Sequence, residues 1–204
     1  MYVMDKSFLL FSHICQFPRG TIFFAEDCLG AGLSPMITRF YLSALAEEGR
    51  IARLARGVFY LPELTEHGMK MRMPTVDQIA EAIARRSNVR IAPCEDQCAY
   101  LAGLTTLQAA PYDYITDGAA RVIHLQNGRT LRFIRRTEAR IFAIRSPRMQ
   151  RLTLGMRALG RQGIGLPEKV VIKENLNWVS QEDFEDALWK TTEWVRDLLL
   201  ELRG

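Results

Sequence analysis

A helix whose two ends are both marked in the sequence, between Ser34 and Gly49, most constrains the fold of this chain. Ser34 is a favourable N-cap, and Pro35 takes the first helical position, where its missing backbone N–H costs nothing. Gly49 is the expected C-cap. Helical spacing places an apolar set on one side of this helix: Ile37, Tyr41, Leu42 and Leu45. It places a mixed set on the other side: Met36, Arg39, Phe40 and Ser43.

The segments on either side of this helix predict a small domain. Asp5 can cap a first helix, which ends at Pro18-Arg19-Gly20. A β-prone run at 21–24 and a brief helix at about 25–29 follow. After Gly49, residues 50–54 and 58–61 are expected to form two strands joined by a tight turn. This order of elements is typical of a winged helix-turn-helix, which we expect over residues 1–62.

In such a domain the second helix of the pair enters the major groove, which is about 12 Å wide, and the hairpin places cations on the flanking phosphates. The expected DNA-binding residues are therefore those of the capped helix and of the hairpin: Ser34, Met36, Thr38, Arg39, Ser43, Arg50, Arg53 and Arg56. A winged helix used only for protein contacts is the alternative, because a fold does not fix a function.

A second, α+β domain is expected over residues 74–174, after a polar connector at 63–73. Thr75 and Gln78 form a capping-box pattern before an amphipathic helix. A short strand at 89–91 and a helix at about 95–101 are expected next. Three strands follow, at 112–116, 121–126 and 129–135, and Asn127-Gly128 is a strong hairpin signal between the last two. With a helix at 148–159, these elements predict helices against a small antiparallel sheet.

The C-terminal segment, residues 175–204, is expected to form an amphipathic helix or a pair of helices. Ser180 and Asp183 can cap it. Its apolar positions could dock on the body of the protein or on a partner, and docking on the body is preferred. They are Phe184, Leu188, Val195, Leu198, Leu199 and Leu202.

Positive charge gathers in the second domain. The whole chain has a formal net charge of +4 and a sequence pI of about 9.0. Residues 74–174 hold sixteen Lys or Arg against nine Asp or Glu, whereas residues 175–204 hold three against seven. This predicts a second basic surface, for DNA or for an acidic protein partner. Its expected residues are Arg129, Arg132, Arg135, Arg136, Arg140, Arg145, Arg148 and Arg151.

No pattern of catalytic or metal-binding residues stands out. Cys94 and Cys98 are one helical turn apart, but a structural zinc site would need two further ligands. P-loop, nucleophile-elbow and HExxH patterns are missing. We therefore expect no catalytic residues, no metal and no cofactor. An enzyme that acts on nucleic acid through the basic face is a further alternative.

The N-terminus lacks a secretory leader pattern, and no apolar run approaches the ~20 residues of a membrane span. These features predict a cytoplasmic protein without a membrane partner, whose four cysteines are reduced.

Two parts of the chain resemble a known family. Residues 17–23 (FPRGTIF) and 45–60 (LAEEGRIARLARGVFY) are similar to the N-terminal winged helix of AbiE-type antitoxins of type IV toxin–antitoxin systems. Residues 74–91 (PTVDQIAEAIARRSNVRI) and 115–136 (ITDGAARVIHLQNGRTLRFIRR) are similar to the C-terminal domain of that family. The resemblance covers roughly residues 15–160.

The resemblance implies a bacterial regulator that binds double-stranded operator DNA and represses its own operon. The second domain would help to neutralise a cognate nucleotidyltransferase toxin, or would support cooperative operator binding by monomers. The family's wing maps onto Arg53, Arg56 and Gly57, and its recognition helix begins at Ser34. Phe40 and Tyr41 depart from the small or polar residues usual in that helix. A protein-interaction adaptor, or a stand-alone regulator without a toxin, is the alternative function.

Overall fold

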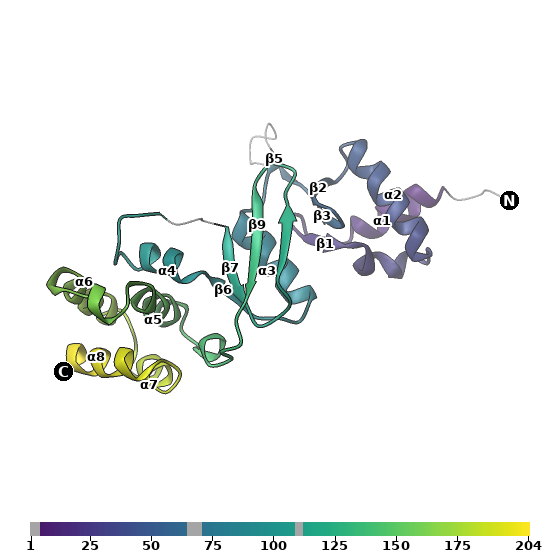
Figure 1. Cartoon of the computed structure of the whole chain (residues 1–204). Coiled ribbons are helices and arrows are strands. Elements are labelled where there is room, and N and C mark those ends of the chain that lie inside the picture. Colours follow the sequence, from purple (N-terminus) through teal and green to yellow (C-terminus); the bar gives the residue numbers. More distant parts are fainter. Residues whose placement is uncertain (1–4, 65–70, 109–111) are drawn as a thin grey trace. The chain divides into compact units, whose positions relative to one another are not determined.

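The structure, a computed structural model, describes residues 5–64, 71–108 and 112–204, and the chain forms two compact units (Figure 1). Unit 1 consists of the chain up to Ile83 together with Ile123–Leu131, and unit 2 consists of Ala84–Val122 and Arg132–Gly204. The class is α+β, as expected. The unit boundaries differ from the expected domains in two ways: residues 74–83 of the expected second domain belong to unit 1, and so does the distant segment Ile123–Leu131.

Unit 1 begins with the predicted order of elements. They are α1 (Lys6–Ile14), β1 (Ile22–Phe24), the 3-10 helix η1 (Ala25–Ala31), α2 (Pro35–Glu47), β2 (Ala52–Ala55) and β3 (Val58–Tyr60). The strands form a small antiparallel sheet in the order β1-β3-β2. The brief helix predicted at about 25–29 is therefore a 3-10 helix, and it extends to Ala31.

Both predicted ends of α2 are confirmed. The Ser34 hydroxyl accepts a hydrogen bond from the backbone N–H of Ile37 at 3.5 Å. Gly49 has a φ of +72°, which glycine adopts without a Cβ clash. The backbone N–H of Arg50 then donates to the carbonyl of Leu45 at 3.0 Å and closes the helix end. Leu42 and Leu45 are fully buried in the core that α2 shares with α1 and the sheet.

The expected connector contains secondary structure. Strands β4 (Glu63–Leu64) and β5 (Met71–Arg72) pair antiparallel, and the Tyr60 hydroxyl donates to the backbone carbonyl of Arg72 at 2.6 Å. Residues 65–70 of the expected connector lie outside the described residues. The next element is α3 (Val76–Arg86), whose capping box is confirmed: the Thr75 N–H donates to Gln78 Oε1 at 2.8 Å, and the Gln78 N–H donates to Thr75 Oγ1 at 3.2 Å.

The predicted Asn127-Gly128 hairpin is confirmed between β8 (Arg121–His124) and β9 (Thr130–Arg135). Gly128 has a φ of +79°, and the Leu125 N–H donates to the carbonyl of Arg129 at 2.9 Å. The tip of this hairpin belongs to unit 1. Leu125 forms an antiparallel bridge with Ala55, and the Gln126 N–H donates to the carbonyl of Leu54 at 2.9 Å.

The four-stranded sheet of the second half has the order β6-β7-β9-β8, where β6 is Ile91–Pro93 and β7 is Asp113–Thr116 (Figure 1). The strand expected at 89–91 thus lies two residues further on. β6 and β7 pair antiparallel, but β7 and β9 pair parallel, with Asp113 opposite Arg132. In the strand order β9 lies between β7 and β8, so β7 pairs with β9 and not with the next strand along the chain. Just after β7, the Asp117 carboxylate accepts a hydrogen bond from the backbone N–H of Arg90 at 2.8 Å.

Helices make up the rest of unit 2: α4 (Glu95–Leu101), α5 (Pro147–Leu159), α6 (Leu166–Leu176), α7 (Gln181–Leu188) and α8 (Glu193–Arg203), with short 3-10 turns η2 (Ile141–Ala143) and η3 (Arg161–Gly163). α4 has the expected bounds, and α5 begins one residue earlier than expected. α6 was not predicted. Figure 1 shows α5 to α8 gathered at the C-terminal end of the chain.

The C-terminal helices form one core with α5. Phe184, Val195 and Leu199 are buried in the same cluster as Met149 and Leu152. The predicted docking of the C-terminal segment on the body of the protein is therefore confirmed, and it uses a pair of helices. Among the helices that the structure describes, none is both long and apolar enough to cross a membrane.

Candidate nucleic-acid interface

The outward face of α2 carries the largest exposed side chains of that helix. Met36 is 78% exposed and Phe40 is 68% exposed. Arg39 lies between them, and its guanidinium is 3.7 Å from a carboxylate oxygen of Glu26, a loose ion pair on the surface. Ser43 is half-buried one turn further on, and its hydroxyl donates to the carbonyl of Arg39 at 3.2 Å. Ser34, at the start of the helix, is exposed.

Thr38 does not belong to this face, and the expectation that it contacts DNA is corrected. Its side chain is 0% exposed, and its hydroxyl donates to the carbonyl of Ser34 at 3.0 Å. Burial of the hydroxyl is acceptable because that hydrogen bond satisfies it. Thr38 therefore anchors the first turn of α2 to the core.

The hairpin of β2 and β3 presents two exposed arginines, Arg53 and Arg56. Among the described residues, no carboxylate lies within 4.0 Å of either guanidinium. Gly57 has a φ of +76°, so the turn between the strands needs a residue without a Cβ. The predicted wing arginines are thus available to an anionic ligand.

Arg50 differs from these two arginines. Its guanidinium carbon lies 3.7 Å from the centre of the Phe11 ring, and one of its nitrogens is 3.7 Å from a Glu48 oxygen. A cation over an aromatic face is stabilised there. The structure thus gives Arg50 a packing contact with α1, which sequence spacing did not reveal.

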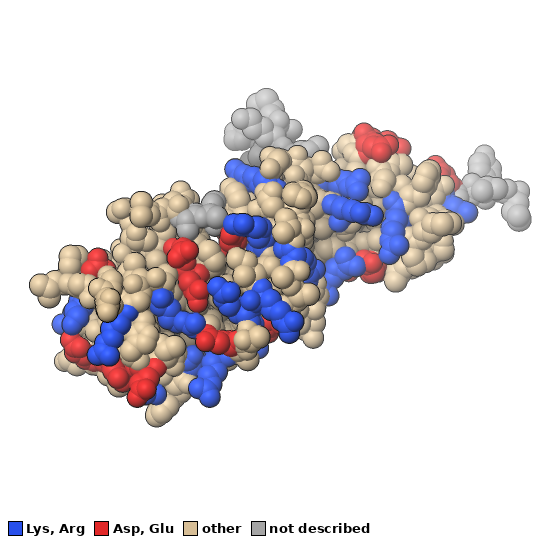
Figure 2. All heavy atoms as spheres, viewed as in Figure 1, with Lys and Arg blue, Asp and Glu red and all other residues tan. Residues whose placement is uncertain are grey.

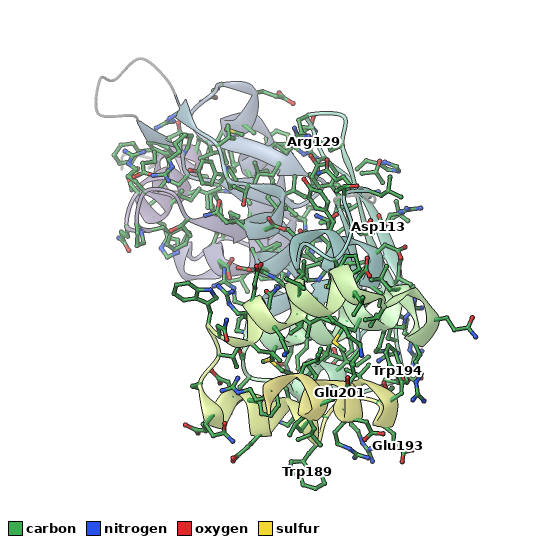
Figure 3. The ribbon with its side chains drawn as sticks, turned by 90° about the vertical axis from the view of Figure 1, so that its left-hand side faces the viewer. Asp113, Arg129, Trp189, Glu193, Trp194 and Glu201 are labelled. Atoms are coloured by element: carbon green, nitrogen blue, oxygen red, sulfur yellow. The ribbon has the colours of Figure 1, made fainter. Side chains whose placement is uncertain are left out.

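Arg129 lies in unit 1 rather than with the other arginines of the expected second surface. Arg129, which is labelled in Figure 3, ends the turn of the hairpin. Leu125 of the same hairpin pairs with Ala55 of β2. The second half of the chain thus supplies a basic residue to the unit that carries α2.

Three of the remaining arginines are held by carboxylates within unit 2. Arg132 forms a bidentate pair with the buried Asp113, which includes a 2.8 Å bond from Nε. A guanidinium nitrogen of Arg136 lies 3.4 Å from a carboxylate oxygen of Glu95. Arg145 is 2.7 Å from Glu182 and 3.4 Å from Asp186. These three side chains remain partly exposed, but each already has a carboxylate partner with which a ligand would have to compete.

The other four expected arginines are exposed: Arg135, Arg140, Arg148 and Arg151. In the part of the chain that the structure describes, no carboxylate lies within 4.0 Å of them. They come from β9, the segment after it and the first turns of α5. Figure 2 shows basic and acidic side chains interleaved over the C-terminal helices. The acidic C-terminal segment, noted in the sequence for its charge alone, thus supplies partners for arginines such as Arg145.

Two of the cysteines, Cys28 and Cys98, have buried thiols. The Cys98 thiol donates to the carbonyl of Pro93 at 3.3 Å, and burial raises its pKa to about 12. Burial likewise raises the pKa of the Cys28 thiol to about 12. Across the described residues, no group of three or more His, Cys, Asp or Glu side chains could hold a metal ion.

These observations define an α+β protein whose first unit carries an exposed helix face beside a basic hairpin. Comparison with known proteins identifies the family of the chain. The chain belongs to a family of unknown function (DUF6088), whose profile matches residues 10–184. No curated protein and no solved structure matched it.

Proposed function

We propose that this chain is a DNA-binding transcriptional regulator, with unit 1 acting as a winged helix-turn-helix domain. The observation that carries the proposal is the pairing of two exposed features in one unit. These are the outward face of α2, with Met36, Arg39 and Phe40, and the hairpin arginines Arg53 and Arg56. The order of elements and the β1-β3-β2 sheet support this assignment.

In this proposal α2 enters the major groove and the hairpin contacts the phosphates beside it. Arg39 would contact a base edge, and the apolar Met36 and Phe40 would contact thymine methyl groups, which project into that groove. Arg53 and Arg56 would add sequence-independent affinity and set the position of the helix. The resemblance to AbiE-type antitoxins extends the proposal to repression of its own operon in the bacterial cytoplasm and to neutralisation of a nucleotidyltransferase toxin.

Binding of the purified chain to the DNA upstream of its own gene, measured by fluorescence anisotropy over a range of salt concentrations, tests the proposal. Each phosphate contact adds about 0.9 to the slope of log affinity against log salt. The double variant Arg53→Ala, Arg56→Ala should reduce the slope by about 1.8. Arg161→Ala, which removes one charge at an exposed position of unit 2, should leave the slope unchanged, whereas each single wing variant should lower it by about 0.9. If the double variant binds like the wild type, the assignment of the wing is wrong.

A protein-interaction adaptor is the second candidate, and the exposed apolar pair Met36 and Phe40 favours it. Large apolar side chains on a surface often mark a protein interface. Phe40→Ala separates the two functions, and Phe8→Ala, at another exposed phenylalanine of unit 1, is its control. Loss of DNA binding in Phe40→Ala alone supports the regulator. Unchanged DNA binding together with loss of a protein partner, such as the toxin, supports the adaptor.

A further inference from the structure

Unit 2 contains a groove of about 780 Å³ between the segment after β9 and the turn that joins α7 to α8. One wall is formed by residues 137–141, and the other by residues 190–193 with Arg196. Arg157 of α5 completes the lining. A volume of this order is typical of sites for small molecules, about 300–1,000 Å³.

The groove is rich in positive charge. Its lining includes the cations Arg140, Arg157, Lys190 and Arg196, against the carboxylates Glu138 and Glu193. Two of the cations are already engaged. Arg157 is 2.6 Å from Glu138 and 3.4 Å from Glu95, and the Lys190 ammonium donates to Asp186 and, at 2.7 Å, to the carbonyl of Ala143.

Arg140 and Arg196 are less constrained. Within the described residues, no carboxylate lies within 4.0 Å of Arg140. In the described part of the chain, the carboxylates nearest to Arg196 are those of Glu193, at 4.0 Å, and Asp197, at 3.9 Å. These are weak pairs, which a ligand oxygen at hydrogen-bond distance would outcompete.

The start of α8 adds hydrogen-bond donors to the same groove. The first N–H groups of a helix have no partner within the helix, and here the N-cap residue Thr192 makes no capping hydrogen bond with its side chain. Glu193 and Trp194, labelled in Figure 3, form the first positions of this helix. A helix N-terminus attracts anions through these N–H groups and through the helix dipole.

Two hydroxyl groups beside the groove have no partner within the described part of the chain. The Oγ1 atoms of Thr191 and Thr192 are buried and find no hydrogen-bond partner among the described residues, although both half-buried residues line the groove. Buried polar groups are nearly always hydrogen-bonded, so each hydroxyl needs a water or a ligand atom as its partner. An anion with several acceptor oxygens would meet that need.

We propose that this groove binds a small molecule with a terminal phosphate group, held by Arg140, Arg196, the Thr192 hydroxyl and the first turn of α8. An extended nucleic-acid backbone fits less well. Glu138 is 54% exposed and Glu193 is 84% exposed, so the lining also carries negative charge. A continuous backbone with many phosphates meets more of that charge than a small molecule with one terminal phosphate group. This site is separate from the α2 face and does not depend on the proposed DNA binding.

Calorimetric titration of the full chain tests the proposal, with AMP, ADP, ATP, adenosine and inorganic pyrophosphate as probes. We expect the phosphate-bearing probes to bind and adenosine not to bind. Comparison of the nucleotides with pyrophosphate distinguishes a nucleotide ligand from a free inorganic phosphate compound. Only the nucleotides carry a nucleoside that can contact the rest of the groove. Arg140→Gln and Arg196→Gln should each weaken binding about tenfold or more, as expected for lost charge-assisted hydrogen bonds.

Arg148→Gln is the control, because Arg148 is exposed on α5 of the same unit and does not line the groove. Thr192→Val removes the hydroxyl without removing a capping bond, and it should weaken binding while the circular dichroism spectrum stays unchanged. The proposal is overturned if no phosphate probe binds at millimolar concentration, or if the Arg140→Gln, Arg196→Gln double variant binds like the wild type. Tighter binding of an oligonucleotide without a terminal phosphate, lost in the same variants, would also overturn it.

Discussion

Leu125 forms a β-bridge with Ala55, and this bridge joins the tip of a hairpin from the second half of the chain to the edge of the N-terminal sheet. Both side chains are buried. The pairing is supported by the hydrogen bond from the Gln126 N–H to the Leu54 carbonyl, at 2.9 Å. The N-terminal unit is therefore completed by residues far away in the sequence.

Leu125→Ala should destabilise the protein by about 2–4 kcal/mol, because it removes buried methyl groups and leaves a cavity. Chemical denaturation followed by circular dichroism measures this change. Leu107→Ala is the control, because Leu107 is largely exposed and its truncation should change the free energy of unfolding by less than about 0.5 kcal/mol. Equal stability of the two variants would show that the Leu125 contact contributes little.

Gly155 lets α4 and α5 approach closely. A Cβ at this position would lie 2.8 Å from the Cα and 2.9 Å from the backbone nitrogen of Ala99. These are backbone atoms, so the helices must separate to accept it. Gly155→Ala should therefore lower the free energy of unfolding by about 1–3 kcal/mol, although alanine favours a helix by itself.

Thermal unfolding of Gly155→Ala measures that loss. Arg151→Ala serves as the control, because it is an exposed position of the same helix and also gains helix propensity. A Gly155→Ala variant that is as stable as the wild type, or more stable, would contradict the close packing of the two helices.

Asp186 makes the stability of unit 2 depend on pH. The backbone N–H of Arg145 donates to its carboxylate at 3.0 Å, and this bond, with the ammonium of Lys190, lowers the pKa of Asp186. A carboxyl group whose pKa is lower in the folded state stabilises the fold above its unfolded pKa, near 3.9, and that contribution is lost as the pH falls through the folded value.

Asp186→Asn should therefore be less stable than the wild type at pH 7, and the difference should shrink below about pH 4. Denaturant titrations at both pH values measure the two free energies of unfolding. A difference that is the same at both pH values would mean that the charge of Asp186 does not contribute. Glu185→Gln, an exposed neighbour, should show little difference at either pH.

The four thiols should differ in reactivity. Cys15 is exposed, whereas burial raises the pKa of Cys28 and of Cys98 to about 12 and raises the pKa of the half-buried Cys94. The thiolate is the reactive form. Titration of the native protein with a thiol reagent at pH 8 should show one fast phase, from Cys15. Cys15→Ser should abolish it, and rapid reaction of all four thiols would contradict the burial of Cys28 and Cys98.

The sequence by itself determined the elements whose signals are local. Ser34-Pro35 and Gly49 define α2, Thr75 and Gln78 define the start of α3, and Asn127-Gly128 defines the turn between β8 and β9. Each of these signals acts within a few residues, through caps and backbone conformations that the residues themselves prefer. Helical spacing predicted the exposed face of α2, and the two short strands with a tight turn predicted the hairpin that carries Arg53 and Arg56.

Only the tertiary structure decided which residues meet across the chain. It placed β9 between β7 and β8, so that β7 and β9 pair parallel, and it joined Leu125 to Ala55. It buried Thr38, which helical spacing alone did not predict. It also showed which arginines of the expected second surface have a carboxylate partner, because a charge pair depends on distance in space and not on distance in sequence.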